Sequence, residues 1–192
     1  LARPQSKSSW KDTKTEGIDI AISLDVSLSM LAKDFNPNRL EVAKEVILDF
    51  IDGRPNDRIG LVLFGGEAFT QCPLTTDHKV LKNMFPQIKA GMLNQGTAIG
   101  LGLANAVARI KDSKAKSKVI IFISDGVNNV GEISPITAGE LAKTYGIRVY
   151  CIGVGTKGKA LQPVAMYAEG QYEYDYVDVD VDEKVMTEIS EL

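Results

Sequence analysis

Long apolar runs and an excess of basic charge are both missing from this sequence, and each absence excludes a class of function. No stretch approaches the roughly 18 consecutive apolar residues that a membrane-spanning helix requires, so we expect the printed segment itself to be soluble. The net charge is -3 at pH 7 and the isoelectric point is about 5.3, which provides no basic field for nucleic acid. The one histidine, His78, follows Asp77 at an expected helix start. We therefore interpret it as an exposed helix residue rather than a catalytic one.

The remaining composition is that of a single globular domain. The chain has 192 residues, of which 44% are hydrophobic and 24% charged, and this length can bury one substantial core. Residues 1–15 are polar and aperiodic, which predicts a solvated lead-in. Because Leu1 and Ala2 precede Arg3 as the end of an apolar segment would, we expect the lead-in to follow a removed membrane segment. The domain is expected to span 16–192 and, since Leu192 ends a helix-like pattern, to be truncated at its C-terminal end.

One short motif concentrates oxygen-bearing side chains. The D-x-S-x-S sequence at 25–29 follows an apolar run at 18–24 and contains Asp25, Ser27 and Ser29. Alternate side chains of an extended segment point the same way, which predicts one carboxylate and two hydroxyls facing one point. With no histidine or cysteine beside them, these oxygens are typical ligands of a hard divalent cation such as Mg²⁺ or Mn²⁺ and suit zinc poorly.

Expected strands and helices alternate along the rest of the chain. The Gly65-Gly66 connection is too short to join parallel strands, so the two strands that flank it are expected to form a hairpin. The overall alternation is typical of an α/β fold with a Rossmann-like, doubly wound sheet and helices on both faces. The expected strands lie at 18–24, 59–64, 68–74, 119–123 and 149–152, and the expected helices begin near residues 38, 77, 97, 134 and 182.

Two further residues are expected to reach the motif at 25–29. In an open α/β sheet the ligand crevice lies beyond the carboxyl ends of the strands. Asp125 follows the apolar run at 119–123, and Thr97 lies in a loop directly before a helix. Asp25, Ser27, Ser29, Thr97 and Asp125 are therefore predicted to share one crevice and to hold Mg²⁺ or Mn²⁺.

Three motifs follow one another along the chain: D-x-S-x-S at 25–29, Gly-Thr at 96–97 and Ser-Asp-Gly at 124–126. In this order they resemble the metal-ion-dependent adhesion site (MIDAS) of von Willebrand factor type A (VWA) domains, and the resemblance covers residues 18–192. Four further segments are Ser-Trp-Lys-Asp at 9–12, Asn-Arg-Leu-Glu at 38–41, Asn-Asp-Arg-Ile-Gly at 56–60 and Thr-Gln-Cys-Pro-Leu-Thr at 70–75. These segments resemble the BatA proteins of bacterial aerotolerance operons.

The resemblance implies a fold and a role for each site residue. The family's sheet has six strands in the order 3-2-1-4-5-6, with strand 3 antiparallel. Ser27 and Ser29 would coordinate the ion directly, Thr97 and Asp125 directly or through water, and Asp25 mainly through water. Hydroxyls are neutral and a carboxylate one water away neutralises less charge, so the ion keeps positive character and an open position for a partner's Asp or Glu.

The same resemblance implies a cellular setting. BatA proteins are anchored in the inner membrane by apolar segments that flank the domain, which would lie on the periplasmic side. The expected partners are a second VWA protein and a MoxR-type AAA+ ATPase. In the implied strand order, Cys72 and Cys151 lie on strands three and five, too far apart for a disulfide, which predicts two free and largely buried thiols.

Three functions remain open at this point. We expect a non-enzymatic, metal-dependent protein-binding module. The alternative is a metal-assisted hydrolase, but no His, Lys or third carboxylate is positioned by the sequence as a general base beside Ser27 or Ser29. The third possibility is a structural metal that stabilises the loops of the crevice without binding a partner.

Two other patterns are interpreted as structural. Residues 153–158 fit G-x-G-x-x-G, but Ala160 replaces the hydroxyl residue of a phosphate loop and Pro163 disfavours the helix that such a loop needs. Acidic residues alternate with Tyr or Val over 171–180, which is typical of a solvated edge strand or hairpin rather than a calcium site.

Overall fold

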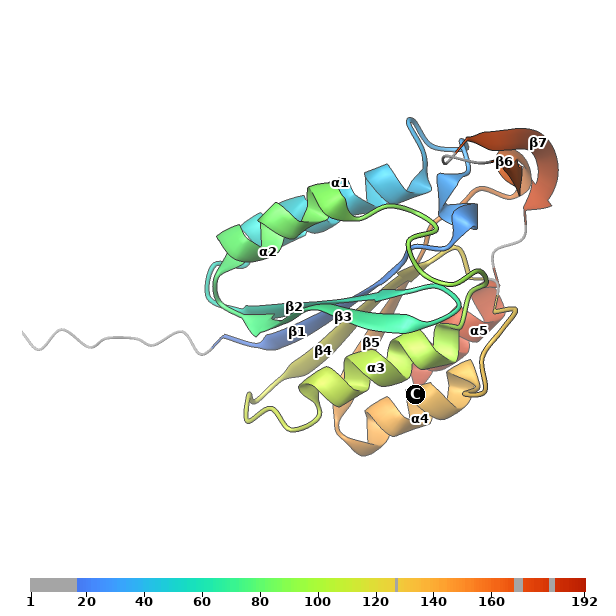
Figure 1. Ribbon diagram of the computed structural model, residues 1–192. Helices are drawn as coiled ribbons and strands as arrows, with labels where there is room; N and C mark the ends of the chain where they lie inside the picture. The colour runs from blue at the N-terminus through green and yellow to red at the C-terminus, as the bar shows by residue number, and fades with distance from the viewer. Residues whose placement is uncertain (1–16, 127, 168–170, 180–181) are drawn as a thin grey trace, which may run out of the picture.

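The fold is built on a mixed β-sheet, as a computed structural model shows for residues 17–126, 128–167, 171–179 and 182–192. The sheet has five strands in the order β3-β2-β1-β4-β5 (Figure 1). Strand β3 is antiparallel to β2, and the other neighbours are parallel. The expected hairpin is confirmed. The strands are β1 (Asp19–Asp25), β2 (Arg58–Phe64), β3 (Ala68–Thr75), β4 (Lys118–Ser124) and β5 (Ile147–Gly153).

Helices cover both faces of this sheet, as predicted (Figure 1). Two lie on one face and three on the other, so the sheet is doubly wound. Several begin where the sequence places a capping side chain: Asn38, Asp77, Ser134 and Asp182 each accept a hydrogen bond from a backbone N–H of the first turn. The helices are α1 (Arg39–Asp52) and α2 (His78–Met84) on one face, and α3 (Ile99–Ile110), α4 (Pro135–Thr144) and α5 (Glu183–Glu191) on the other.

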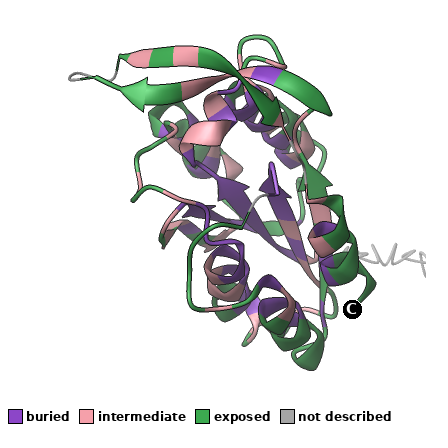
Figure 2. Cartoon of the chain, turned by 90° about the vertical axis from the view of Figure 1, so that its right-hand side faces the viewer, coloured by how far each residue is buried: buried purple, intermediate pink, exposed green. Residues whose placement is uncertain are grey.

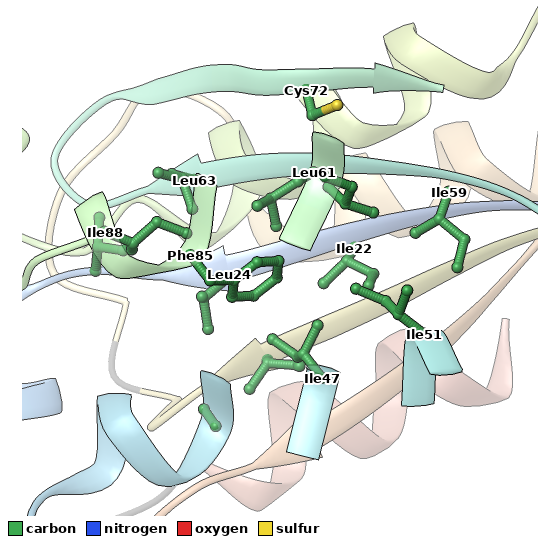
Figure 3. Close-up of a cluster of buried hydrophobic side chains, with 14 of the residues drawn as sticks. Ile22, Leu24, Ile47, Ile51, Ile59, Leu61, Leu63, Cys72, Phe85 and Ile88 are labelled. Atoms are coloured by element: carbon green, nitrogen blue, oxygen red, sulfur yellow. The ribbon is translucent and has the colours of Figure 1, made fainter. Parts of the chain in front are cut away.

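Side chains of the central strand β1 point alternately to the two faces of the sheet, and the core is accordingly divided into two layers. Every residue of β1 is buried, because both of its faces are covered. Ile22 and Leu24 point to the α1 side, where they pack near Ile47 and Ile51 of α1 (Figure 3). Ala21 belongs to the opposite layer, under α3. This parity places Asp25 on the α3 side of the strand's end.

The second layer brings α3 very close to the sheet. Phe64 of β2 and Phe122 of β4 stack with their ring centroids 4.8 Å apart. Gly102 of α3 lies directly on this pair, and a Cβ atom at Gly102 would meet Phe64 Cγ at 2.5 Å. The hydroxyl of Ser23 donates to the Gly102 carbonyl at 3.2 Å. The glycine therefore fixes the height of α3 above the sheet, and with it the loop that precedes α3.

The sixth strand of the expected order does not occur among the described residues. After β5 the chain forms β6 (Gly158–Met166) and β7 (Tyr172–Val179), which pair with each other as a separate antiparallel hairpin. Helix α5 then packs against β5, with Ile189 in the second core layer. The strand order is thus confirmed for its first five members. The chain that follows β5 forms this hairpin instead of a sixth strand of the sheet. Strands β6 and β7 pair their backbone hydrogen-bonding groups with each other.

Several other expectations can be compared with the fold. Cys72 and Cys151 are free thiols on opposite edge strands, as predicted; Cys72 is buried and Cys151 half-buried. His78 is half-buried rather than exposed, because its ring contacts the Asp57 carbonyl at 2.9 Å. Among the described residues, no helix combines the length and the apolar character needed to cross a bilayer. The predicted lead-in at 1–15 lies outside the described residues.

Candidate metal centre

The D-x-S-x-S motif forms a strand end followed by a tight turn. Strand β1 ends at Asp25, and Leu28–Leu31 form a 3-10 helix, η1. The predicted alternation therefore does not extend to Ser29, and that part of the prediction is wrong. The turn nevertheless brings the hydroxyls together, because Met30 N–H donates to the Ser27 carbonyl at 3.2 Å. The Oγ atoms of Ser27 and Ser29 lie 2.9 Å apart.

Asp25 is fully buried and organises the turn rather than facing the crevice directly. One carboxylate oxygen accepts from Ser27 N–H at 2.8 Å, and the other accepts from Ser124 Oγ at 2.6 Å. Burial raises the pKa of Asp25 to about 7, with a further contribution from the charge of Asp125, although the hydrogen bonds oppose the change. A divalent cation beside both carboxylates would counteract these effects by favouring the charged form.

Thr97 is held by the segment that follows β4. Its N–H donates to Asn129 Oδ1 at 2.8 Å, and its carbonyl accepts from Asn129 N–H at 3.1 Å. Asn128 Oδ1 accepts from Ile99 N–H at 2.9 Å, which fixes the first turn of α3. Gly96 has φ = 104°, and a Cβ there would meet Val130 Cγ2 at 2.7 Å. Only glycine fits this position without strain, so the Gly-Thr pair serves to bring Thr97 close to the β4 loop.

Asp125 contacts a buried arginine that the prediction did not include. Arg39, the first residue of α1, is 1% exposed, and its Nη1 donates to Asp125 Oδ2 at 3.1 Å. The same guanidinium donates to Asp34 from Nε at 2.8 Å and from Nη2 at 2.7 Å. Arg39 therefore joins a carboxylate of the candidate site to a second carboxylate outside it.

A cavity of about 210 Å³ lies at the carboxyl ends of the strands, and Ser29, Thr97 and Asp125 are among the residues that line it. The β6–β7 hairpin lies across this end of the sheet (Figure 2), where Leu161 accepts a backbone hydrogen bond from Lys33 at 3.0 Å. Larger cavities lie beside α5 and at the opposite end of the strands, and they contain none of the predicted site residues. The 210 Å³ cavity is lined by Ser29, Arg39, Thr97, Asp125, Asn129, Gln162, Asp178 and Val179.

The donor set of this cavity fits a hard cation better than a soft one. Ser29, Thr97 and Asp125 line it directly, Ser27 touches Ser29, and Asp25 lies behind them through Ser27 and Ser124. Among the described residues, no group of three or more His, Cys, Asp or Glu side chains converges on a common point. Hydroxyls with a minority of carboxylates are typical of Mg²⁺ or Mn²⁺ coordination. The five predicted residues therefore meet at one end of the sheet, although only three of them line the cavity.

The sequence reasoning missed the residues that hold this site in place. Arg39 was interpreted only as part of a helix start, and Asn129 was given no role. A basic residue at the first position of a helix, where its charge is unfavourable near the positive end of the helix dipole, was an available signal for Arg39. The asparagines after Ser-Asp-Gly were a weaker signal, because asparagine is common in any loop.

Replacing Asn129 by alanine is expected to weaken metal binding without removing a ligand. The change removes the acceptor of Thr97 N–H, and loss of a group that orients a ligand typically reduces metal affinity by about 10- to 100-fold. Isothermal titration with Mg²⁺ measures the change. Asn94→Ala is the matched control, since Asn94 is exposed and makes its hydrogen bonds through its backbone. Equal Mg²⁺ affinity in the two variants would show that Asn129 does not support the site.

Comparison with known proteins identifies the class of domain. The model of the von Willebrand factor type A domain matches residues 20–128, and the chain belongs to this family. Among solved structures it is similar to BatB from Bacteroides thetaiotaomicron, with a TM-score of 0.81 and 35% identity over 91% of this chain and 86% of that one. It is equally similar to an aerotolerance-related membrane protein from Bacteroides fragilis, with a TM-score of 0.80 and 33% identity over 91% of this chain and 87% of that one. The resemblance to aerotolerance proteins is thus confirmed, with BatB as the named relative.

Two more relatives bear on the site and on the size of the whole protein. Proximal thread matrix protein 1 from mussel byssus, solved with a zinc-occupied MIDAS motif, has a TM-score of 0.64 and 29% identity over 74% of this chain and 37% of that one. A protein of Borreliella burgdorferi is 36% identical over 191 residues, which cover 99% of this chain and 56% of that protein. The chain spans about half the length of the curated relatives it matches.

Proposed function

We propose that this VWA domain is a metal-dependent protein-binding module, in which Mg²⁺ or Mn²⁺ held in the crevice takes an Asp or Glu side chain from a partner. Ser27, Ser29, Thr97 and Asp125 would hold the ion, and Asp25 would act through water and through the backbone of the turn. When bound, the ion would supply a positive charge with one exchangeable position. The chain's own residues would orient that position toward the 210 Å³ cavity.

The observation that carries this proposal is that the carboxylates of Asp25 and Asp125 are both already engaged by other groups of the protein. Both oxygens of Asp25 accept hydrogen bonds from Ser27 and Ser124, and Asp125 shares its charge with Arg39. Neutral hydroxyls would therefore provide most of the direct contacts to an ion. A divalent cation in such a site keeps more of its charge than one held by three carboxylates, and it favours an anionic ligand from outside.

A metal-assisted hydrolase is the second candidate, and the cavity favours it less. The lining residues include no histidine or lysine. The lining residue Asp178 is exposed on the hairpin, and the basic Arg39 is engaged by Asp34 and Asp125. A serine hydroxyl needs a general base within hydrogen-bond reach to act as a nucleophile. Ser27 and Ser29 contact each other instead. A structural role for the metal without any partner is the third candidate, and the experiment below separates it from the first.

The proposed setting is a membrane-anchored aerotolerance protein, with the domain on the periplasmic side of the inner membrane and with anchors in parts of the protein beyond this chain. The proposed partners are a second VWA protein and a MoxR-type AAA+ ATPase. The similarity to BatB and to an aerotolerance-related membrane protein supports this proposal. Direct contact with either partner would require an exposed acidic residue on the partner's surface.

The test is capture of the purified candidate partners by the immobilised domain in Mg²⁺ and in EDTA. Capture is expected in Mg²⁺ and not in EDTA, and Thr97→Val should reduce it at least about tenfold, because valine keeps the shape and removes one oxygen donor. Thr76→Val is the matched control, since Thr76 is exposed and lies at the start of α2. Mg²⁺ binding that stabilises the domain while capture is the same in EDTA would favour the structural role. Hydrolysis of a generic phosphoester that disappears in Ser27→Ala would favour the hydrolase.

A further inference from the structure

Arg39 is a buried cation beside a site that is proposed to bind another cation. Its guanidinium is 1% exposed and contacts two carboxylates at 2.7 Å and 3.1 Å, those of Asp34 and Asp125. Two positive charges that share one carboxylate repel each other strongly in a partly desolvated site. An arginine at this position is therefore expected to lower the affinity of the site for a metal ion.

The second carboxylate holds the guanidinium in place. Asp34 accepts from Nε and Nη2 of Arg39 in a fork geometry, which fixes the plane of the group as a lysine could not. Asp34 also accepts from the Thr156 N–H at 2.9 Å and the Thr156 hydroxyl at 3.2 Å. Burial alone would raise the pKa of Asp34, but the hydrogen bonds from Arg39 and Thr156 keep it below its usual value. Arg39 is therefore anchored from the side away from the cavity.

Anchoring limits where Asp125 can move. Because Nη1 of Arg39 donates to Asp125 Oδ2, a direct bond from that oxygen to an ion would require either the loss of this hydrogen bond or the approach of the ion to the guanidinium. The fork on Asp34 also prevents Arg39 from following Asp125 toward an ion without breaking two hydrogen bonds.

We propose that Arg39 is a positioning residue that holds Oδ2 of Asp125 and shares the charge of this carboxylate, so that metal binds weakly until a partner's carboxylate completes the site. This inference rests on the proposed function and names how the same site is regulated. Metal and acidic partner then bind cooperatively, because each supplies the charge that the other lacks. Thr156 belongs to the connection between β5 and the β6–β7 hairpin, so this anchor also joins the metal centre to the element that crosses it.

The test measures Mg²⁺ affinity by isothermal titration in a paired variant, Asp34→Asn with Arg39→Met. Replacing both members avoids leaving Asp34 as a buried charge without its arginine. We expect the paired variant to bind Mg²⁺ on the order of tenfold more tightly than the wild type, because Asp125 no longer shares its charge with a guanidinium. A purely structural role for Arg39 predicts the opposite sign, since a loosened site binds metal more weakly. Arg39→Lys retains the charge but not the fork on Asp34, so it should tighten Mg²⁺ binding less than the paired variant does.

Two controls decide the interpretation. Asp34→Asn alone keeps the guanidinium and should not tighten Mg²⁺ binding. The pair Asp34→Asn with Arg39→Gln makes the same change of charge with a polar side chain. If the methionine variant does not fold, the Mg²⁺ affinity of this second pair tests the inference. Affinity at or below the wild-type value in folded paired variants, or equal tightening in Arg39→Lys, would overturn the inference. Failure of the proposed function looks different: the wild type itself would then bind no Mg²⁺, or Asp25→Asn would bind it equally well.

Discussion

Asp25→Asn is expected to abolish the stabilisation of this domain by Mg²⁺. At about 100 times its dissociation constant, Mg²⁺ should raise the free energy of unfolding of the wild type by about 2.7 kcal/mol. The variant should gain nothing measurable. Asparagine keeps the size of the side chain but removes the charge, and its amide group can replace only one of the two acceptors that Ser27 N–H and Ser124 Oγ use. Urea unfolding with and without Mg²⁺ gives the result directly.

The control for this experiment removes a carboxylate elsewhere. Asp112→Asn changes the net charge equally, and Asp112 is exposed in the turn between α3 and β4, at the opposite end of the sheet. It should retain the full Mg²⁺ effect. If Asp25→Asn were stabilised by Mg²⁺ as much as Asp112→Asn, the ion would bind somewhere other than the crevice, and the proposed function would lose its physical basis.

The sequence was sufficient for those site residues that follow strands. Asp25 and Asp125 end two adjacent parallel strands, and such ends always lie at one edge of a sheet. Ser29 does lie beside Ser27, but not through the alternation that was predicted. Side chains alternate with a period of two in a strand, whereas the chain has already entered a 3-10 helix at Leu28. Only the hydrogen bonds of this helix show that Ser29 turns back toward Ser27. The small polar residues of the motif are compatible with both geometries.

Contacts between segments that are far apart in the sequence could not be predicted from it. Asp34 and Thr156 are separated by 122 positions and meet through one carboxylate, and nothing periodic marks either residue. The stretch at 171–180 was predicted to form an edge strand or hairpin, and Tyr172–Val179 form β7 of the β6–β7 hairpin, but the position of this hairpin was not predicted. Pairing between β6 and β7 is local and follows from alternation, whereas the docking of the hairpin over the cavity depends on single contacts such as Lys33 with Leu161 and Lys33 with the Tyr174 ring.

The position of the hairpin changes how a partner must approach. Gln162, Asp178 and Val179 of the hairpin line the cavity together with Ser29 and Thr97. Under the proposed function, a partner's acidic side chain would therefore contact the hairpin as well as the loops of the sheet.

The metal-free domain is expected to lose stability as the pH rises from about 4 to about 7. Burial, together with the charge of Asp125, raises the pKa of Asp25 from 3.8 to about 7. The folded state therefore binds a proton more tightly than the unfolded state in this range. The stabilisation is complete below the unfolded value and is lost as the pH passes through the folded value. A shift of this size corresponds to a loss on the order of 2 to 4 kcal/mol.

Because other carboxylates also titrate, the measurement must isolate Asp25. Asp34, with its lowered pKa, acts in the opposite direction below pH 4. The relevant quantity is the difference in unfolding free energy between the wild type and Asp25→Asn, measured in EDTA at pH 5 and pH 8. The variant should gain relative to the wild type at pH 8, since it carries no charge to bury. Saturating Mg²⁺ should reduce the part of the pH dependence that Asp25 contributes, because the ion favours the ionised carboxylate that burial disfavours. A difference that stays constant between the two pH values would mean that Asp25 is ionised in the folded domain without any metal, and the charge argument for the site would then fail.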